Sequence, residues 1–238
     1  MRVAILAALP GELKPLVRGW YLVHSPTKGI SIWVRTAGED EYVAVCGGMG
    51  SAAALRSFAA AEHIGPLDMV LSVGWAGALD DSMTPSRCYM PAEIIDALTG
   101  ERFSLTGGER TVRLVTTPRV ANVSEKRRLR DAYTAVLVDM EASVIARLAQ
   151  IRSIPVYCFK GVSDGPGLAL PDLNPYIDEM GQLQLLPFLA YVALHPQYWG
   201  SLLRLGRTSG AAAKSLAATI KTFLETTAVE GPNQTGAV

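Results

Sequence analysis

The chain has 238 residues, of which 49% are hydrophobic and 18% charged, so it can bury a full-sized core. Its 22 basic residues are balanced by 22 acidic ones, which argues against a nucleic-acid binder, because such proteins carry a surplus of Lys and Arg. The three cysteines are scattered and the chain has only three histidines, so we expect reduced thiols, no metal site and a cytoplasmic location.

Short apolar segments recur along the chain, each ended by Gly, Pro or a charged residue. Continuous apolar segments are typical of strands covered on both faces of a mostly parallel sheet. The first segment is too short to span a membrane and lacks a cleavage pattern, so we interpret it as a strand. Strands are therefore predicted at 3–9, 42–46, 69–74, 135–140 and 154–162.

Helical periodicity lies between these strands, at 11–19, 50–63, 124–132 and 141–152. This alternation predicts a three-layer α/β/α fold with a mixed, mostly parallel central sheet. The sheet should be mixed because the alternating segment 30–36 turns into an antiparallel hairpin with 42–46. A second antiparallel pair is expected near 86–98 and 111–117.

The C-terminal region is predicted to be helical from residue 176, with an interruption near Pro196. We expect a single domain over 1–225 that ends in a basic amphipathic helix over 197–225, and a disordered tail at 231–238. A basic helix face is either simply solvated or in contact with an anionic membrane surface. The basic side chains that share this face are Arg204, Arg207, Lys214 and Lys221.

A glycine-rich turn joins the strand at 42–46 to the helix at 50–63. Gly48, Gly50 and Ala53 match the Gly/Ala variant of the dinucleotide-binding fingerprint, so an oxidoreductase of the NAD type is one alternative. The fingerprint also requires an acidic residue at the end of the next strand, and that strand ends without one. The oxidoreductase is therefore the weaker interpretation.

Polar residues follow several of the predicted strands. Glu12 comes after the first strand, Glu141 after the fourth, and Asp164 after the last. Because the carboxyl ends of parallel strands line the ligand crevice, these three carboxylates should meet at one edge of the sheet. Each also has a purely structural explanation, since acidic residues favour helix N-termini and an Asp before Gly-Pro-Gly shapes a turn.

Four motifs occur in order along the chain: "ILAALPGEL" (5–13), "VGWAGAL" (73–79), "VDMEASVIA" (138–146) and "KGVSDG" (160–165). They resemble the nucleoside phosphorylase and nucleosidase superfamily, whose members cleave the bond between a nucleobase and ribose. The C-terminal "LLRLGRTSGAAAKSL" (202–216) is most similar to the hopanoid-associated phosphorylase branch. Members of that branch are thought to remove adenine from an adenosyl-hopane lipid precursor.

The resemblance implies the partners of the protein. The substrate would be a small nucleoside, adenosyl and lipid-linked if the branch assignment holds, and no cofactor would be needed. The helical segment 200–224 would then contact the membrane peripherally. Family members commonly form homodimers or larger homo-oligomers, so we expect the same here.

The resemblance also implies roles for individual residues. Asp164 would donate a proton to the departing base, oriented by Ser163. Glu141 would accept hydrogen bonds from the ribose hydroxyls, with Met140 against the sugar. Glu12 would activate the attacking water. Further substrate contacts are expected from Gly74, Trp75, Ala76, Gly77, Val120 and Lys160.

The nucleophile is the main open question. Phosphorylases hold phosphate with arginines and a hydroxyl in the Gly-rich turn, where this chain has Ser72 and Trp75. A carboxylate at Glu12 would also repel phosphate, so hydrolysis is favoured. A phosphorylase remains an alternative, because backbone amides with Arg56 or Lys160 could hold phosphate. A non-catalytic protein that senses adenine is the other alternative.

Overall fold

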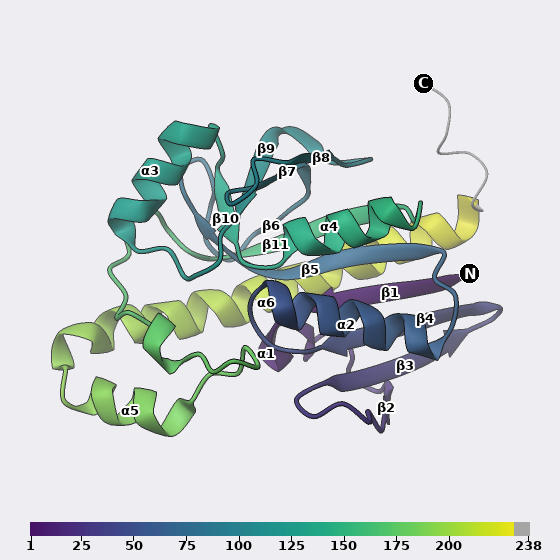
Figure 1. Cartoon of the computed structure of the whole chain (residues 1–238), viewed down its shortest axis with the longest axis horizontal. Helices are drawn as coiled ribbons and strands as arrows, with labels where there is room; N and C mark the ends of the chain where they lie inside the picture. The colour runs from purple at the N-terminus through teal and green to yellow at the C-terminus, as the bar shows by residue number, and fades with distance from the viewer. Residues whose placement is uncertain (231–238) are drawn as a thin grey trace.

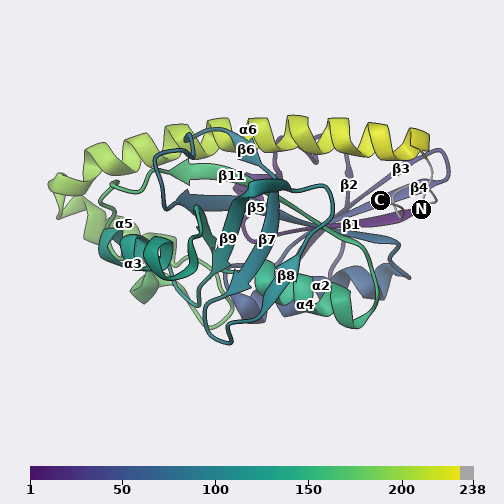
Figure 2. The same ribbon diagram turned by 90° about the horizontal axis from the view of Figure 1, so that it is seen from above.

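A mixed sheet of eleven strands lies between two layers of helices in the computed structural model, which describes residues 1–230 (Figures 1 and 2). The predicted three-layer fold is confirmed. Its strands are β1 (Arg2–Ala7), β2 (Tyr21–Val23), β3 (Ser31–Ala37), β4 (Asp40–Cys46), β5 (Met69–Ala78), β6 (Cys88–Tyr89), β7 (Pro91–Asp96), β8 (Arg102–Ser104), β9 (Glu109–Thr116), β10 (Leu137–Asp139) and β11 (Val156–Asp164).

The helices cover both faces of this sheet. In Figure 2, α6 lies along one face, and α2 and α4 lie together on the other. Their bounds are α1 (Pro10–Leu13), α2 (Ser51–Ile64), α3 (Val123–Tyr133), α4 (Ala142–Ile151), α5 (Leu185–Ala193) and α6 (Trp199–Glu230), with short 3₁₀ helices η1 (Asn174–Tyr176) and η2 (Pro196–Tyr198).

The centre of the sheet is parallel. β1 pairs in parallel with β4 and β5, and β5 pairs in parallel with β11. β3 runs antiparallel to β4, which confirms the predicted hairpin. The second expected antiparallel pair is wrong: β7 pairs in parallel with β9, because the turn after β7 leads first into the short antiparallel strand β8.

The central strands are apolar on both faces because both faces are covered. Successive residues of a strand point to opposite sides of the sheet. Ile5 of β1 therefore packs in the core beneath α6, together with Leu216, whereas Leu6 packs beneath α2 and α4, together with Phe58. Most side chains in these interiors are apolar, and several of the buried acidic residues lie near the ends of strands, among them Glu12, Asp139 and Asp164.

The helix predicted over 11–19 is shorter than expected. α1 makes a single turn, because Pro15 follows it and has no N–H to continue the helical hydrogen bonds. The following residues form turns that still bury Leu16 and Val17 against the sheet.

The C-terminal helix α6 extends from Trp199 to Glu230, against the expected 197–225. Its buried face includes Ala212, Leu216, Ile220 and Leu224, and its four basic residues are exposed on the other side. The tail expected at 231–238 lies outside the described residues. Within the described part of the chain, no helix is long and apolar enough to cross a membrane.

The packing of α6 can be tested by a matched pair of substitutions. Leu216→Ala removes a side chain that is 1% exposed, whereas Leu203→Ala removes one on the same helix that is 64% exposed. We expect Leu216→Ala to lower the free energy of unfolding by about 2–5 kcal/mol, because it leaves a cavity in the core. Leu203→Ala should change it by less than about 0.5 kcal/mol in urea unfolding. Equal effects would contradict this packing.

Candidate active site

A cavity of about 300 Å³ opens where β1, β5, β10 and β11 end. It brings together nine of the eleven predicted site residues: Glu12, Trp75, Ala76, Gly77, Val120, Met140, Glu141, Ser163 and Asp164. β1, β5 and β11 run in parallel, as expected for ligand sites of this architecture, and β10 runs antiparallel to the end of β5, so polar residues from four strands meet in one place. Much of the remaining wall is apolar and includes Leu170, Leu173, Leu183, Phe188, Leu202 and Leu205.

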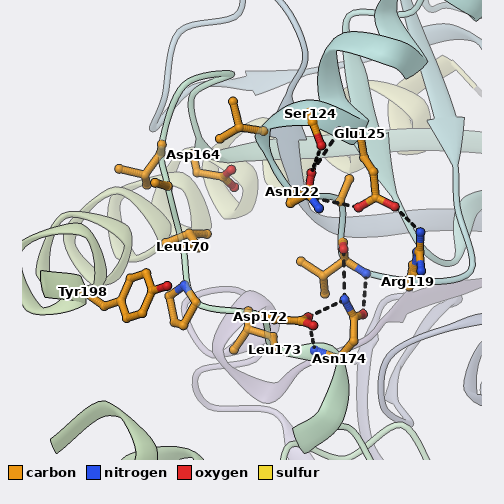
Figure 3. A pocket seen from close by; sticks show the side chains of 16 residues that line it. Arg119, Asn122, Ser124, Glu125, Asp164, Leu170, Asp172, Leu173, Asn174 and Tyr198 are labelled. Atoms are coloured by element: carbon orange, nitrogen blue, oxygen red, sulfur yellow. Dashed lines mark hydrogen bonds and ion pairs between the residues drawn. The ribbon is translucent and has the colours of Figure 1, made fainter. Parts of the chain in front are cut away.

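A second cavity of about 460 Å³ adjoins the first and shares Val120, Asp164 and Leu170 with it. Figure 3 shows this outer cavity, with Asp164 and Leu170 on one side and the segment after β9 on the other. Asp164 therefore lies at the junction of the two spaces.

Glu12 is 4% exposed and is held by backbone amides. Its Oε2 accepts hydrogen bonds from the N–H of Ala8 at 2.9 Å and of Leu9 at 2.7 Å, and its Oε1 from the N–H of Trp75 at 2.7 Å. Pro10 begins α1, which places Glu12 where its side chain turns back to the helix start. Burial raises the pKa of Glu12, although these amides and Lys160 oppose the rise.

Gly74 supports Glu12 from the neighbouring strand. It has a φ of 146°, and a Cβ there would come within 2.8 Å of Oε1 of Glu12. Only glycine permits this approach, because the carboxylate occupies the space of a side chain. Gly74 is not among the residues that line the cavity, and the structure shows its contact with Glu12, so its contact with substrate stays a prediction.

Trp75 connects the cavity to two helices. Its indole Nε1 donates to the carbonyl oxygen of Ser209 on α6 at 3.0 Å. The other edge of the ring lies over α1, where a Cβ on Gly11 would come within 2.8 Å of it. The indole is therefore fixed beside Glu12, whose Oε1 accepts from the backbone N–H of the same residue.

Glu141 is anchored at one oxygen and lines the cavity. Its Oε1 accepts from the N–H of Gly50 at 2.6 Å, and its Oε2 accepts a longer hydrogen bond from the N–H of Met140 at 3.3 Å. Burial and the neighbouring Asp139 raise the pKa of Glu141 to about 8, although Lys160 opposes the rise. Two hydroxyl donors from a bound sugar would favour the ionised form of this carboxyl.

Lys160 lies beneath the cavity and not in it. The side chain is 1% exposed and its ammonium lies 2.8 Å from Oδ2 of Asp139. Burial lowers the pKa of Lys160, but Asp139 more than offsets this and the net shift is upward. Asp139 also accepts from the hydroxyl of Thr116 at 2.7 Å and the N–H of Ala142 at 3.0 Å. The prediction that Lys160 contacts substrate is therefore corrected, because its ammonium pairs with Asp139 inside the core.

Asp164 has donors on both carboxylate oxygens. The hydroxyl of Ser163 donates to Oδ1 at 2.5 Å, and the ammonium of Lys126 forms a short ion pair with Oδ2. Lys126 also donates to the carbonyl oxygen of Gly165 at 2.9 Å and is only 4% exposed. The sequence reasoning missed Lys126, which belongs to a strongly basic segment. The available signal was its position three residues before the buried Leu129, on the same face of α3.

The loop before α3 contributes Val120, whose backbone is already paired. Its N–H donates to Oδ1 of Asn174 at 2.9 Å, and its carbonyl oxygen accepts from Nδ2 of Asn174 at 3.1 Å. Asn174 also donates to Asp172 at 2.7 Å, as Figure 3 shows. The sequence carried no signal for Asn174, because its partner lies 54 residues away.

The side chains proposed to hold phosphate lie elsewhere. Arg56 donates to the carbonyl oxygen of Met180 at 2.8 Å, and neither Arg56 nor Lys160 lines the cavity. The basic residues on its wall are Lys126, bound to Asp164, and Arg119, bound to Glu125. Within residues 1–230, no cluster of His, Cys, Asp or Glu could hold a metal ion.

Comparison with known proteins agrees with this architecture. The family model of the phosphorylase superfamily matches residues 2–122, half of the chain. The chain belongs to this superfamily, and the predicted enzyme class, a nucleoside N-glycosidase, is confirmed. The alternative of an NAD-type oxidoreductase is therefore set aside. No curated protein sequence matches the chain.

Solved structures show the same fold at low sequence identity. The 5′-methylthioadenosine/S-adenosyl homocysteine nucleosidase of Helicobacter pylori is 12% identical with a TM-score of 0.72, over 95% of this chain and 99% of that one. The futalosine hydrolase of Helicobacter pylori is 13% identical with a TM-score of 0.72, and the match covers 95% of this chain and 98% of that one. The 5′-methylthioadenosine nucleosidase of Arabidopsis thaliana is 16% identical with a TM-score of 0.74, and the match covers 98% of this chain and 97% of that one.

The raised pKa of Glu141 predicts how a neutral variant changes stability with pH. In the wild type, this carboxyl favours the folded state below its ordinary pKa of 4.5, and that contribution is lost as pH rises towards about 8. Glu141→Gln does not titrate at this position and lacks this loss. The Tm of Glu141→Gln minus the Tm of the wild type should therefore be larger at pH 8 than at pH 5 by roughly 10 °C. Differential scanning calorimetry measures this difference.

Glu39→Gln is the control for this experiment, because Glu39 is exposed on the loop between β3 and β4. Its Tm should follow that of the wild type at both pH values. A Glu141→Gln variant whose Tm differs from that of the wild type by the same amount at pH 5 and pH 8 would contradict the assignment.

Proposed function

We propose that the protein hydrolyses the N-glycosidic bond of a purine nucleoside and releases the base. The observation that carries this proposal is the state of Glu12: a buried carboxylate on the cavity wall, bound by three backbone amides. A carboxylate with a raised pKa is suited to accept a proton from water.

The other two carboxylates suit the remaining tasks of this reaction. Cleavage passes through a state in which positive charge develops on the ribose, and Glu141 can hold the sugar hydroxyls beside that charge. Asp164, with Ser163 on one oxygen, also lines the cavity and would protonate the leaving base. The three acids differ in their surroundings, which is how similar groups take different roles.

Water is a better fit to the site than phosphate. The amides of Ala8, Leu9 and Trp75, which could otherwise hold an anion, are occupied by Glu12. Phosphate would then face the Glu12 carboxylate, and the nearby cations in residues 1–230 already have acidic partners: Lys160 pairs with Asp139, Lys126 with Asp164 and Arg119 with Glu125. The fixed indole of Trp75 narrows the same region. The similar structures cited above are named as nucleosidases and a hydrolase, which also supports hydrolysis.

We extend the proposal to an adenosyl substrate with an apolar group at the ribose 5′ position. The support is the apolar outer wall of the cavity, which includes Leu170, Leu202 and Leu205. An adenosyl-hopane lipid precursor, suggested by the sequence resemblance, is one such substrate. A homo-oligomer is also proposed from that resemblance.

Base release measured by chromatography tests this function. The substrates are adenosine, 5′-methylthioadenosine, S-adenosylhomocysteine, inosine and an adenosyl-lipid mimic, each with and without phosphate. We expect adenine from at least one adenosyl compound without phosphate, and a rate at least about 100-fold lower in Glu12→Gln. Release that requires phosphate would show a phosphorylase, and tight adenine binding without any release would show a sensor.

We also propose a peripheral membrane contact, supported by exposed side chains of α5 and α6. Leu186 of α5 is 81% exposed, and Trp199 and Leu203 of α6 are 51% and 64% exposed, close in sequence to the exposed Arg204 and Arg207. Exposed apolar side chains next to basic ones are typical of helices that lie on anionic lipid.

Flotation with liposomes tests this contact. We expect the protein to float with anionic liposomes at low salt, and the variant with Leu186→Ser and Leu203→Ser to stay in solution. Neutral phosphatidylcholine liposomes are the control for the electrostatic part. A wild-type protein that does not float at low salt would contradict the membrane contact.

A further inference from the structure

Lys126 is the cation closest to the proposed acid, and no role has yet been given to it. Its ammonium is bound between Oδ2 of Asp164 and the carbonyl oxygen of Gly165, on the wall of the cavity. The side chain passes over Gly77, where a Cβ would come within 3.1 Å of both Cε and Nζ. Glycine at this position of β5 therefore leaves room for the lysine to reach Asp164.

The position of Lys126 is built into the start of α3. The side chain of Asn122 accepts from the N–H of Glu125 at 3.0 Å, and Glu125 accepts from the N–H of Asn122 at 3.1 Å. This reciprocal cap fixes the first turn of the helix, and Lys126 is the next residue. Few charged side chains are buried unless they are paired, and here the partner is the group that contacts the base in the proposed reaction.

The hydrogen bonds of Asp164 raise the question of where its proton comes from. Oδ1 accepts from Ser163, and Oδ2 accepts from Lys126, so the carboxylate is a double acceptor. A carboxylate in this state has no O–H to donate to a leaving base. Of the two donors that contact Asp164, the ammonium of Lys126 is the one that can readily supply a proton, because an ammonium is a much stronger acid than a hydroxyl.

In residues 1–230, the other charged groups on the cavity wall have partners or proposed roles other than Asp164. Glu12 is bound by amides and accepts the proton of water in the proposed reaction. Asp139 is paired with Lys160, Arg119 with Glu125, and Glu141 accepts from Gly50. Among the groups that line this wall in residues 1–230, only Lys126 touches Asp164 and carries an ionisable proton.

We infer that Lys126 is a positioning residue that also supplies the proton of the departing base through Asp164. As the bond between ribose and base breaks, its electron pair goes to the base. One proton moves from Nζ of Lys126 to Asp164, and one moves from Asp164 to a ring nitrogen of the base. Lys126 is left as a neutral amine and regains its proton from water once the base has left. This inference rests on the proposed function.

The test compares two substrates that differ in their need for a proton. Cleavage of a purine nucleoside needs the base to be protonated, whereas 4-nitrophenyl riboside releases a stable phenolate without help. We expect Lys126→Met to lower kcat/KM at least about 100-fold for the purine nucleoside and less than about 5-fold for the nitrophenyl compound. Arg127→Met, an exposed change on the same helix, is the matched control and should leave both rates unchanged.

Lys126→Arg tests whether Lys126 acts by its charge or by the proton that it supplies. This variant keeps a positive charge beside Asp164, so a loss of activity cannot be attributed to an unpaired buried carboxylate. Arginine keeps the ion pair with Asp164 but does not give up a proton in proteins, so this variant should be as slow on the purine as Lys126→Met. The pH profile is a further readout. Without Lys126, Asp164 must carry its own proton, so the remaining activity on the purine should rise as pH falls.

The outcomes separate the inference from the proposed function. Full rescue by Lys126→Arg, or equal losses on both substrates with an unchanged pH profile, would overturn the proton role of Lys126 while the function stands. A wild-type protein that cleaves neither substrate would overturn the proposed function, and this inference with it. Lys126→Met added to Asp164→Asn should cause no further loss on the purine, because both residues act in one step.

Discussion

The buried ion pair between Lys160 and Asp139 is the interaction on which the candidate site depends. It joins β11 to the end of β10, and the residues that follow each partner carry the proposed chemistry: Glu141 two positions after Asp139, and Asp164 four positions after Lys160. Both side chains are within the core, where removal of one partner typically costs about 3–5 kcal/mol because the other charge is left unpaired. The pair therefore restricts the relative positions of two strand ends that make no direct contact in the sheet.

The same low-polarity interior explains why the three carboxyl groups of the site, Glu12, Glu141 and Asp164, have different hydrogen-bond donors. A buried carboxylate needs donors, and the structure supplies different ones to each. Glu12 has backbone amides only, Glu141 has one short and one long amide contact, and Asp164 has a hydroxyl and an ammonium. Amides hold a carboxylate in place without offering it a proton, whereas an ammonium can give one up. In the proposed reaction, these surroundings would distinguish Glu12, which accepts a proton, from Asp164, which passes one on.

Helix α6 contributes to both stability and the site. It packs so closely on β11 that a Cβ on Gly161 would lie 3.1 Å from the carbonyl oxygen of Ala212. Its first half holds the indole of Trp75 through Ser209, and Thr208 donates to the carbonyl oxygen of Ser163. The helix that covers one face of the sheet therefore also sets the shape of the cavity near Glu12 and Asp164.

The sequence by itself determined the fold class, the central strands and the edge at which the polar residues meet. These follow from local patterns, because the apolar content of a strand and the polar residue that ends it are both read within a few positions. Glu12, Glu141 and Asp164 could be found in this way. Only the tertiary structure decided their partners. Lys126 and Asp164 are 38 residues apart, and Lys160 contacts Asp139 instead of the cavity, because burial and charge pairing depend on which strands become neighbours.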